Sequence, residues 1–195
     1  LADSRLRATG LIIPGTDSVH LSGLVNGQHH QDYLLPLADR QYRLINTYNQ
    51  TWNLYPAASC RMVLESSVFG ELLSMDSSMV DIRSSICDGS GGYVGAEHGS
   101  RLNLLMATLY TQLVSRDRSQ VFAGYSNVQF QTVNACGASV MILVFCNTEY
   151  DPVALDTSVI FVSDFTVPQG ASVGSYVPIT GTVQVGQPLS LPPSE

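Results

Sequence analysis

Two dense runs of apolar residues, separated by a short polar stretch, constrain this chain more than any other feature of its sequence. "SVMILVFC" (139–146) and "SVIFVSDF" (158–165) are rich in Val, Ile and Phe, and each has the length of one strand. Continuous apolar runs of this length are typical of strands that are covered on both faces. We therefore predict two strands buried between two sheets, with Asp151-Pro152 and Asp156 in the connection between them.

The remaining sequence predicts further strands and one or two helices. "NVQFQTV" (127–133) alternates apolar and polar residues, and 175–191 has the composition of a last strand region. The segment 68–80 is a candidate for a short helix. After the possible N-cap Ser100, residues 101–114 show i, i+3, i+4 spacing, which predicts an amphipathic helix. Its apolar face would consist of Leu102, Leu105, Met106, Leu109, Tyr110 and Leu113.

The strand count indicates the fold class. About eight or nine short strands are predicted, and no internal repeat is found. This pattern favours a mainly β protein, an antiparallel β-sandwich or jelly roll with one or two short helices in its connections. We predict a single domain over residues 1–195, in which 188–195 is an extended tail.

The charge content limits the classes of partner. Charged residues make up 13% of the chain against 45% hydrophobic residues, and the net charge is −7. All nine basic residues are scattered arginines, so direct binding of nucleic acid is not expected from this segment. No apolar stretch of about 18 residues is found, so no membrane span is expected. Low charge with many apolar residues is typical of proteins that associate with copies of themselves.

No residue set predicts catalysis, a metal site or a cofactor. Asp156-Thr157-Ser158 is similar to the turn of aspartic proteases, but a turn aspartate explains it without chemistry. His29-His30 and Asp32 are candidate metal ligands, yet neighbouring residues of an extended segment point to opposite sides. The four cysteines form no C-x-x-C pair, and Cys136 and Cys146 are predicted to be buried thiols. We therefore predict no enzyme, while a hydrolase whose triad includes His98 and a serine stays as an alternative.

Aromatic residues near position 50 are the candidates for ligand binding. Trp52 is the single tryptophan, and Tyr48 and Tyr55 lie close to it in sequence. Such a cluster suits a glycan or a receptor surface, whereas strand-spaced aromatic residues also form cores. The second functional alternative is thus a lectin-like or fibre-head module that binds a glycan or receptor.

The last forty residues carry a resemblance to a known class of proteins. In "LDTSVIFVSDFTVPQGASVGSYVPITGTVQVGQPLSL" (155–191), an aspartate-bearing turn precedes an apolar strand, a Pro/Gly/Ala loop and a final strand. That final strand, Ile179 to Val185, ends in a Gly-x-φ-x-φ pattern. The segment resembles the last two strands of the jelly-roll coat proteins of small icosahedral RNA viruses, and the tymovirus-like coats most of all.

The resemblance implies a structural role. It implies a capsid or surface-spike domain that assembles with copies of itself into an icosahedral shell, and a location in the virion. A chain that is not viral would be secreted or extracellular under the glycan-binding alternative. The family's basic N-terminal arm has no counterpart beyond Arg5 and Arg7.

Overall fold

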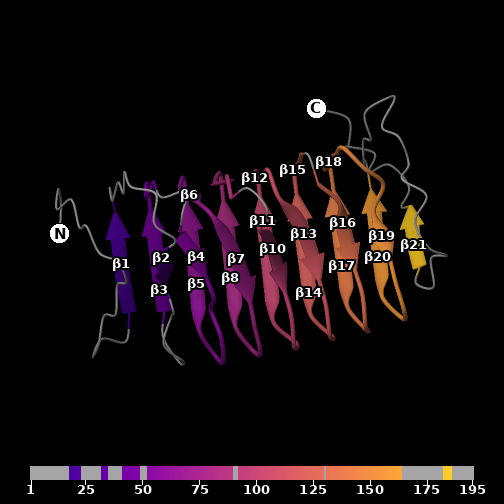
Figure 1. Cartoon of the computed structure of the whole chain (residues 1–195), viewed down its shortest axis with the longest axis horizontal. Coiled ribbons are helices and arrows are strands. Elements are labelled where there is room, and N and C mark those ends of the chain that lie inside the picture. Colours follow the sequence, from indigo (N-terminus) through magenta and orange to yellow (C-terminus); the bar gives the residue numbers. More distant parts are fainter. Residues whose placement is uncertain are drawn as a thin grey trace, which may run out of the picture.

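The computed structural model is a parallel β-solenoid, in which the chain winds through three sheets once per coil (Figure 1). The structure describes residues 18–22, 32–34, 41–48, 52–89, 92–129, 131–163 and 182–185. Every strand pairing in these ranges is parallel and joins one coil to the next. The prediction of an antiparallel β-sandwich or jelly roll is therefore wrong.

The largest sheet has nine strands and runs the length of the solenoid. Its members are, in spatial order, β1 (Ser18–Ser22), β3 (Gln41–Ile45), β5 (Arg61–Glu65), β8 (Met79–Arg83), β11 (Arg101–Leu105), β14 (Gln120–Gly124), β17 (Val140–Val144), β20 (Val159–Ser163) and β21 (Thr182–Val185). From β3 to β20 the strands begin 18 to 22 residues apart. That interval is the length of one coil.

Two smaller sheets complete each coil. The five-stranded sheet holds β6 (Val68–Phe69), β9 (Ile86–Cys87), β12 (Thr108–Leu109), β15 (Asn127–Val128) and β18 (Asn147–Thr148). The seven-stranded sheet holds β2 (Asp32–Leu34), β4 (Trp52–Leu54), β7 (Glu71–Ser74), β10 (Tyr93–Ala96), β13 (Gln112–Ser115), β16 (Val133–Ala135) and β19 (Val153–Ala154).

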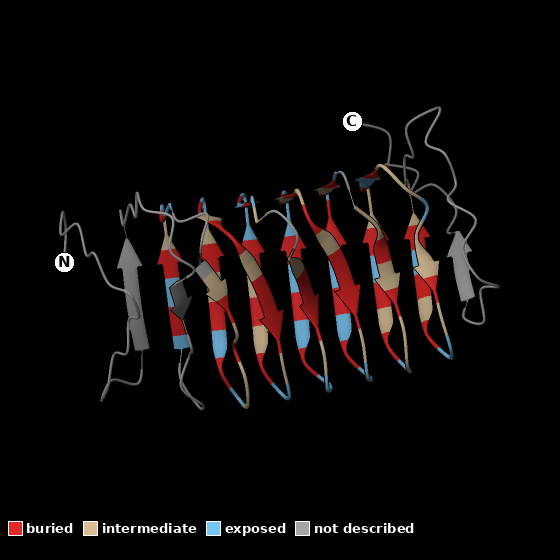
Figure 2. Cartoon of the chain, in the orientation of Figure 1, coloured by how far each residue is buried: buried red, intermediate tan, exposed pale blue. Residues whose placement is uncertain are grey.

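The interior is one continuous apolar column enclosed by the three sheets. In β3, β5, β8, β11, β14, β17 and β20, the second and fourth residues point inward, as with Leu102 and Leu104 in β11, which are both fully buried. Figure 2 shows these buried positions as bands that recur from coil to coil. Because each coil buries its apolar residues against the coils beside it, stability comes from stacking rather than from any single coil.

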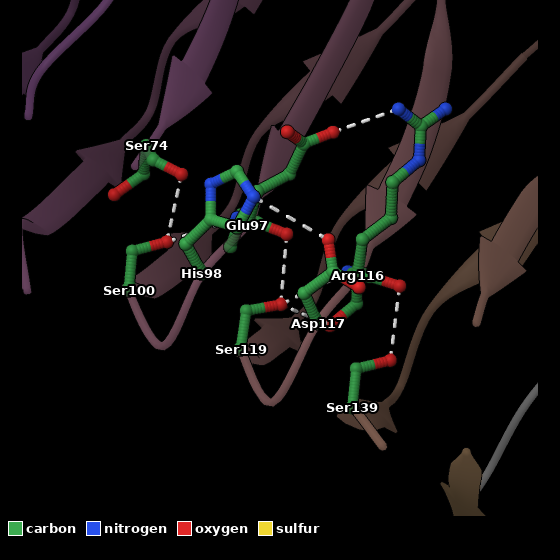
Figure 3. Close-up of polar contacts among 10 residues, drawn as sticks. Ser74, Glu97, His98, Ser100, Arg116, Asp117, Ser119 and Ser139 are labelled. Atoms are coloured by element: carbon green, nitrogen blue, oxygen red, sulfur yellow. Dashed lines mark hydrogen bonds and ion pairs between the residues drawn. The ribbon is translucent and has the colours of Figure 1, made fainter. Parts of the chain in front are cut away.

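A ladder of buried serines lies at the corner where the seven-stranded sheet returns to the nine-stranded sheet in five successive coils. We call this the serine corner; its members are Ser78, Ser100, Ser119, Ser139 and Ser158. Each hydroxyl donates a hydrogen bond to a backbone carbonyl of the preceding coil, at 2.7–3.0 Å. The same carbonyl also accepts a backbone N–H bond, so both of its lone pairs are used. Figure 3 shows three of these serines side by side.

Replacing one serine of this ladder is expected to destabilise the whole solenoid. Ser119 donates to the carbonyl of Ala96 and lies 2.9 Å from the hydroxyl of Ser115, with no exposure to solvent. Ser119→Ala leaves these buried groups short of a partner, so we expect the free energy of unfolding to fall by about 1–3 kcal/mol. Chemical denaturation would measure it. The matched control is Ser77→Ala, whose hydroxyl bonds the carbonyl of Ala58 in an exposed turn where water can replace it. Equal effects for both variants would contradict the role of the ladder.

The predicted helices are absent from the described residues, where strands replace them. Segment 101–114 forms β11, β12 and most of β13, and 68–80 forms β6, β7 and the start of β8. Within one strand, side chains point alternately into the core and out to solvent, but this alternation starts afresh after each corner. Apolar residues of three short strands can therefore follow one another at the spacing of a helix. The structure accordingly buries Leu104, which the helical face omits, and exposes Leu105 and Met106, which it includes.

The sequence does contain a repeat, contrary to the prediction. From β5 to β20, successive coils share a small residue directly before the strand of the nine-stranded sheet and an alternating strand after it, but few identities. Their lengths also differ, so a search for identical residues at a fixed interval fails.

The resemblance to viral coat proteins implies a jelly roll, and the structure does not have that fold. Strands β20 and β21 are parallel neighbours in adjacent coils of the solenoid, whereas the last strands of a jelly roll belong to antiparallel sheets. The strand predictions at 139–146 and 158–165 are confirmed as β17 and β20, but only one face of each is buried. Asp156 is a turn residue, as predicted, with its carboxylate accepting from the backbone N–H of Gly137 at 3.0 Å. The segment between β20 and β21 and the residues after β21 lie outside the described residues.

Candidate functional site: an apolar sheet face and a cleft

The outer face of the nine-stranded sheet changes character halfway along the solenoid. From β3 to β20, the first, third and fifth residues of each strand in this sheet point outward. In β3, β5 and β8 they include Arg43, Glu65, Asp81 and Arg83, with ion pairs between Arg43 and Glu65 at 3.2 Å and between Arg83 and Asp81 at 3.8 Å. Such a surface is well solvated and has no need of a partner.

The same positions in β14, β17 and β20 are mostly apolar. Phe122, Ile142 and Phe161 form one row across β14, β17 and β20, where the register pairs each with the next. They are 38–40% exposed. The Phe122 ring and the Leu105 side chain both lie beside Gly124, at 3.3 Å and 3.5 Å from the position that a Cβ on this glycine would take. The outer positions of these three strands carry no charge.

The corner that follows each strand of the nine-stranded sheet repeats this division. We call it the left-handed corner, because its residues have φ of 46–53°: Asn46, Ser66, Ser84, Met106, Tyr125 and Phe145. The first three are polar and the last three are large and apolar. Tyr125 and Phe145 stack with their ring centroids 4.8 Å apart, while Tyr125 remains 60% exposed.

Bulky residues at the left-handed corner act against local stability. Positive φ costs an ordinary residue about 1–2 kcal/mol, and asparagine tolerates it better than most. Asn46 shows that this corner accepts asparagine. Met106, Tyr125 and Phe145 therefore occupy a position where a smaller polar residue would fold more easily, and strained residues of this kind cluster at functional surfaces.

We define the apolar face by six exposed side chains: Leu105, Met106, Phe122, Tyr125, Ile142 and Phe161. Large side chains of these kinds have about 150–250 Å² of surface each, so together they expose roughly 500 Å². The largest apolar patch on a typical monomer has about this size and is often functional.

A second feature, a cleft of about 390 Å³, lies on the outer face of the seven-stranded sheet across β13, β16 and β19. Its floor includes Val114, which points outward yet is only 2% exposed, and Val153. Asn134 stands between these two valines in the strand register. Thr132 and Gln112 form its polar side, and the Asn134 amide donates to the Thr132 hydroxyl at 2.8 Å.

A neutralised ion pair borders this cleft. The Arg116 guanidinium donates to the Glu97 carboxylate at 2.7 Å, as Figure 3 shows, and lies 5.5 Å from the centroid of the Tyr93 ring. The Glu97 side chain is only 13% exposed, and its hydrogen bond and charge raise the pKa of Arg116 against the opposing effect of burial. The cleft therefore offers amide and hydroxyl groups over an apolar floor with little net charge.

The predicted ligand-binding aromatics lie apart from both features. Tyr55 follows β4 of the seven-stranded sheet and donates to Glu71 at 2.5 Å. Tyr48 bridges to Val68 on the line of the five-stranded sheet, so the two tyrosines belong to different faces. Trp52 begins β4, but its side chain lies outside the described residues.

The groups proposed for chemistry do not assemble into a reactive centre in the described part of the chain. His98 Nε2 lies 3.6 Å from the Asp117 carboxylate on the exposed side of the serine corner, while the hydroxyl of Ser100 is buried and donates to the Ser74 carbonyl. No group of three or more His, Cys, Asp or Glu suited to a metal ion occurs there, and His29-His30 lie outside it.

The cysteines in the described ranges are free thiols that resist ionisation. Burial raises the pKa of Cys60 and of Cys87 to about 12, and burial also raises the pKa of Cys136 and of Cys146. Because the thiolate is the nucleophile, these groups are unsuited to nucleophilic catalysis. Cys146 is buried as predicted, whereas Cys136 is partly exposed beside the cleft.

Comparison with known proteins adds no relative. No protein-family model, curated protein or solved structure matches this chain. In the described residues, no helix has the length and apolar character needed to cross a membrane.

Proposed function

We propose that this protein is a structural solenoid that associates with a second copy of itself through the apolar face. The observation that carries the proposal is the change from charged to apolar residues at equivalent positions of the same sheet, between β8 and β14. Nothing in the coil requires this change, because the charged half has the same backbone arrangement.

Charge favours a second copy as the partner. The chain has a net charge of −7, so two copies repel each other over most surfaces. The outer positions of β14, β17 and β20 carry no charge, so a face-to-face contact there brings no like charges together. An apolar surface is also complementary to itself, as a symmetric interface between identical chains requires.

The size of the face indicates a weak association. Two copies would bury roughly 1,000 Å², which is at the lower limit for specific interfaces. We therefore expect a dissociation constant in the micromolar range, about −8 kcal/mol. Sedimentation velocity over a hundredfold range of protein concentration should show a reversible shift from monomer to dimer. A single monomeric species throughout would contradict the proposal.

The left-handed corner offers a variant with opposite effects on folding and association. Met106→Asn removes a 55% exposed apolar side chain and places at φ 53° the residue that Asn46 already provides in another coil. We expect the free energy of unfolding of the monomer to rise by about 0.5–1 kcal/mol. Self-association should weaken by about tenfold.

Denaturation of dilute protein and sedimentation at high concentration would measure the two effects separately. Ser84→Asn is the matched control, because it also places asparagine at a position of positive φ, but in the charged half of the sheet. It should leave association unaltered. If Met106→Asn lowered stability, or if Ser84→Asn weakened association equally, the assignment of this corner to an interface would be wrong.

A further inference from the structure

We propose that the cleft across β13, β16 and β19 binds one or two rings of a neutral carbohydrate. The cleft lies on the seven-stranded sheet, away from the apolar face on the nine-stranded sheet. The inference is therefore independent of self-association.

The side chains of the cleft match the two kinds of surface that a sugar presents. A sugar hydroxyl both donates and accepts hydrogen bonds, and the amides of Gln112 and Asn134 and the hydroxyl of Thr132 can do the same. Asn134 uses one amide hydrogen for Thr132, and its carbonyl oxygen accepts no bond from a described residue. The C–H face of a sugar ring requires apolar surface, which Val114 and Val153 supply.

Three amide or hydroxyl groups around an apolar floor form a typical small-molecule site. The volume, about 390 Å³, lies near the lower end of the range for such sites. It suits one or two sugar rings rather than a long buried oligomer. The cleft is not closed over, so a longer chain could extend from it along the sheet.

The electrostatics favour a neutral ligand over an anionic one. Among the described residues that line the cleft, Arg116 is the one cation, and its guanidinium is already bound to Glu97. An anionic sugar or a phosphate would have to compete with that partly buried carboxylate, on a chain of net charge −7. A neutral sugar needs no such exchange.

The test uses the full chain labelled with ¹⁵N and titrated with defined sugars. The probes are glucose, mannose, galactose and N-acetylglucosamine, the linear hexasaccharides of glucose, mannose and N-acetylglucosamine, and hexagalacturonate as the acidic comparison. We expect at least one neutral probe to give saturable shifts centred on Asn134, and hexagalacturonate to give none. Binding of a monosaccharide would identify a free sugar as sufficient, whereas binding of hexasaccharides alone would identify a glycan chain.

Two variants test the site itself. Asn134→Ala should weaken binding at least tenfold, whereas Asn127→Ala should not change it, since that amide pairs with Asn147 on the five-stranded sheet. Val153→Arg places a long side chain in the cleft from an outward position and should abolish binding. Thermal unfolding would verify that each variant folds.

Three results would overturn the proposal. The first is the absence of saturable shifts with every neutral probe. The second is binding that survives both Asn134→Ala and Val153→Arg. The third is binding of hexagalacturonate as tight as that of the neutral sugars.

Discussion

Ile142→Asp is expected to abolish self-association while the monomer stays folded. Ile142 is at the centre of the apolar row, between Phe122 and Phe161 in the strand register, and its side chain points away from the core. In a symmetric dimer each substitution enters the interface twice. An unpaired carboxylate in an apolar contact costs about 2 kcal/mol or more per copy. We therefore expect association to weaken by roughly a thousandfold. Sedimentation velocity at the highest protein concentration should show only monomer.

Val63→Asp is the control for this variant. Val63 has the same position in β5 that Ile142 has in β17, and it is also β-branched and outward-pointing. Its cross-strand neighbours are Arg43 and Asp81, so a new carboxylate there meets one charge of each sign. Association should stay as in the unchanged protein. If Val63→Asp and Ile142→Asp reduced association equally, general repulsion rather than the apolar face would explain the result.

The strands were more predictable than their arrangement. The β-branched runs correctly indicate β17 and β20, because strand propensity and apolar length are local properties. Whether two strands pair in parallel depends on partners about twenty residues away, which local composition does not report. The signal for this arrangement that the sequence contains is the serine that recurs once per coil, as Ser78, Ser100, Ser119, Ser139 and Ser158. Each precedes an alternating strand at nearly one coil length, and a buried corner explains why a small hydroxyl residue recurs there.

The candidate face could be predicted only in its general character. The low charge content indicates self-association. Ile142 and Phe161, however, are predicted as core residues, because an apolar run does not reveal which side of a strand is covered. Once the inward positions are known from Met141 and Ile160, the outward residues are identified at once. The cleft was missed for a related reason, since Gln112 and Asn134 become neighbours only when consecutive coils stack.

Leu104→Ala and Leu105→Ala together test the fold through two adjacent residues of one type. Leu104 is fully buried in the column and Leu105 is 38% exposed on the apolar face. Loss of a buried leucine side chain removes its transfer free energy and leaves a cavity, so Leu104→Ala should lower the free energy of unfolding by about 2–5 kcal/mol. Leu105→Ala should lower it by less than about 1 kcal/mol, measured in dilute protein where the monomer dominates.

An amphipathic helix over 101–114 requires the reverse order. In that arrangement Leu105 lies on the apolar stripe and Leu104 does not, so Leu105→Ala would be the damaging change. Urea denaturation of both variants, with the m-value checked for constancy, separates the two arrangements by several kcal/mol. The strength of self-association supplies a second contrast, because the Leu105 side chain lies beside Gly124, next to the Phe122 ring on the apolar face. Leu105→Ala should weaken dimerisation while sparing stability, and Leu104→Ala should do the opposite as long as the protein remains folded. A solenoid with an outward apolar face requires both contrasts, and a larger loss of stability from Leu105→Ala would refute the assigned register of β11.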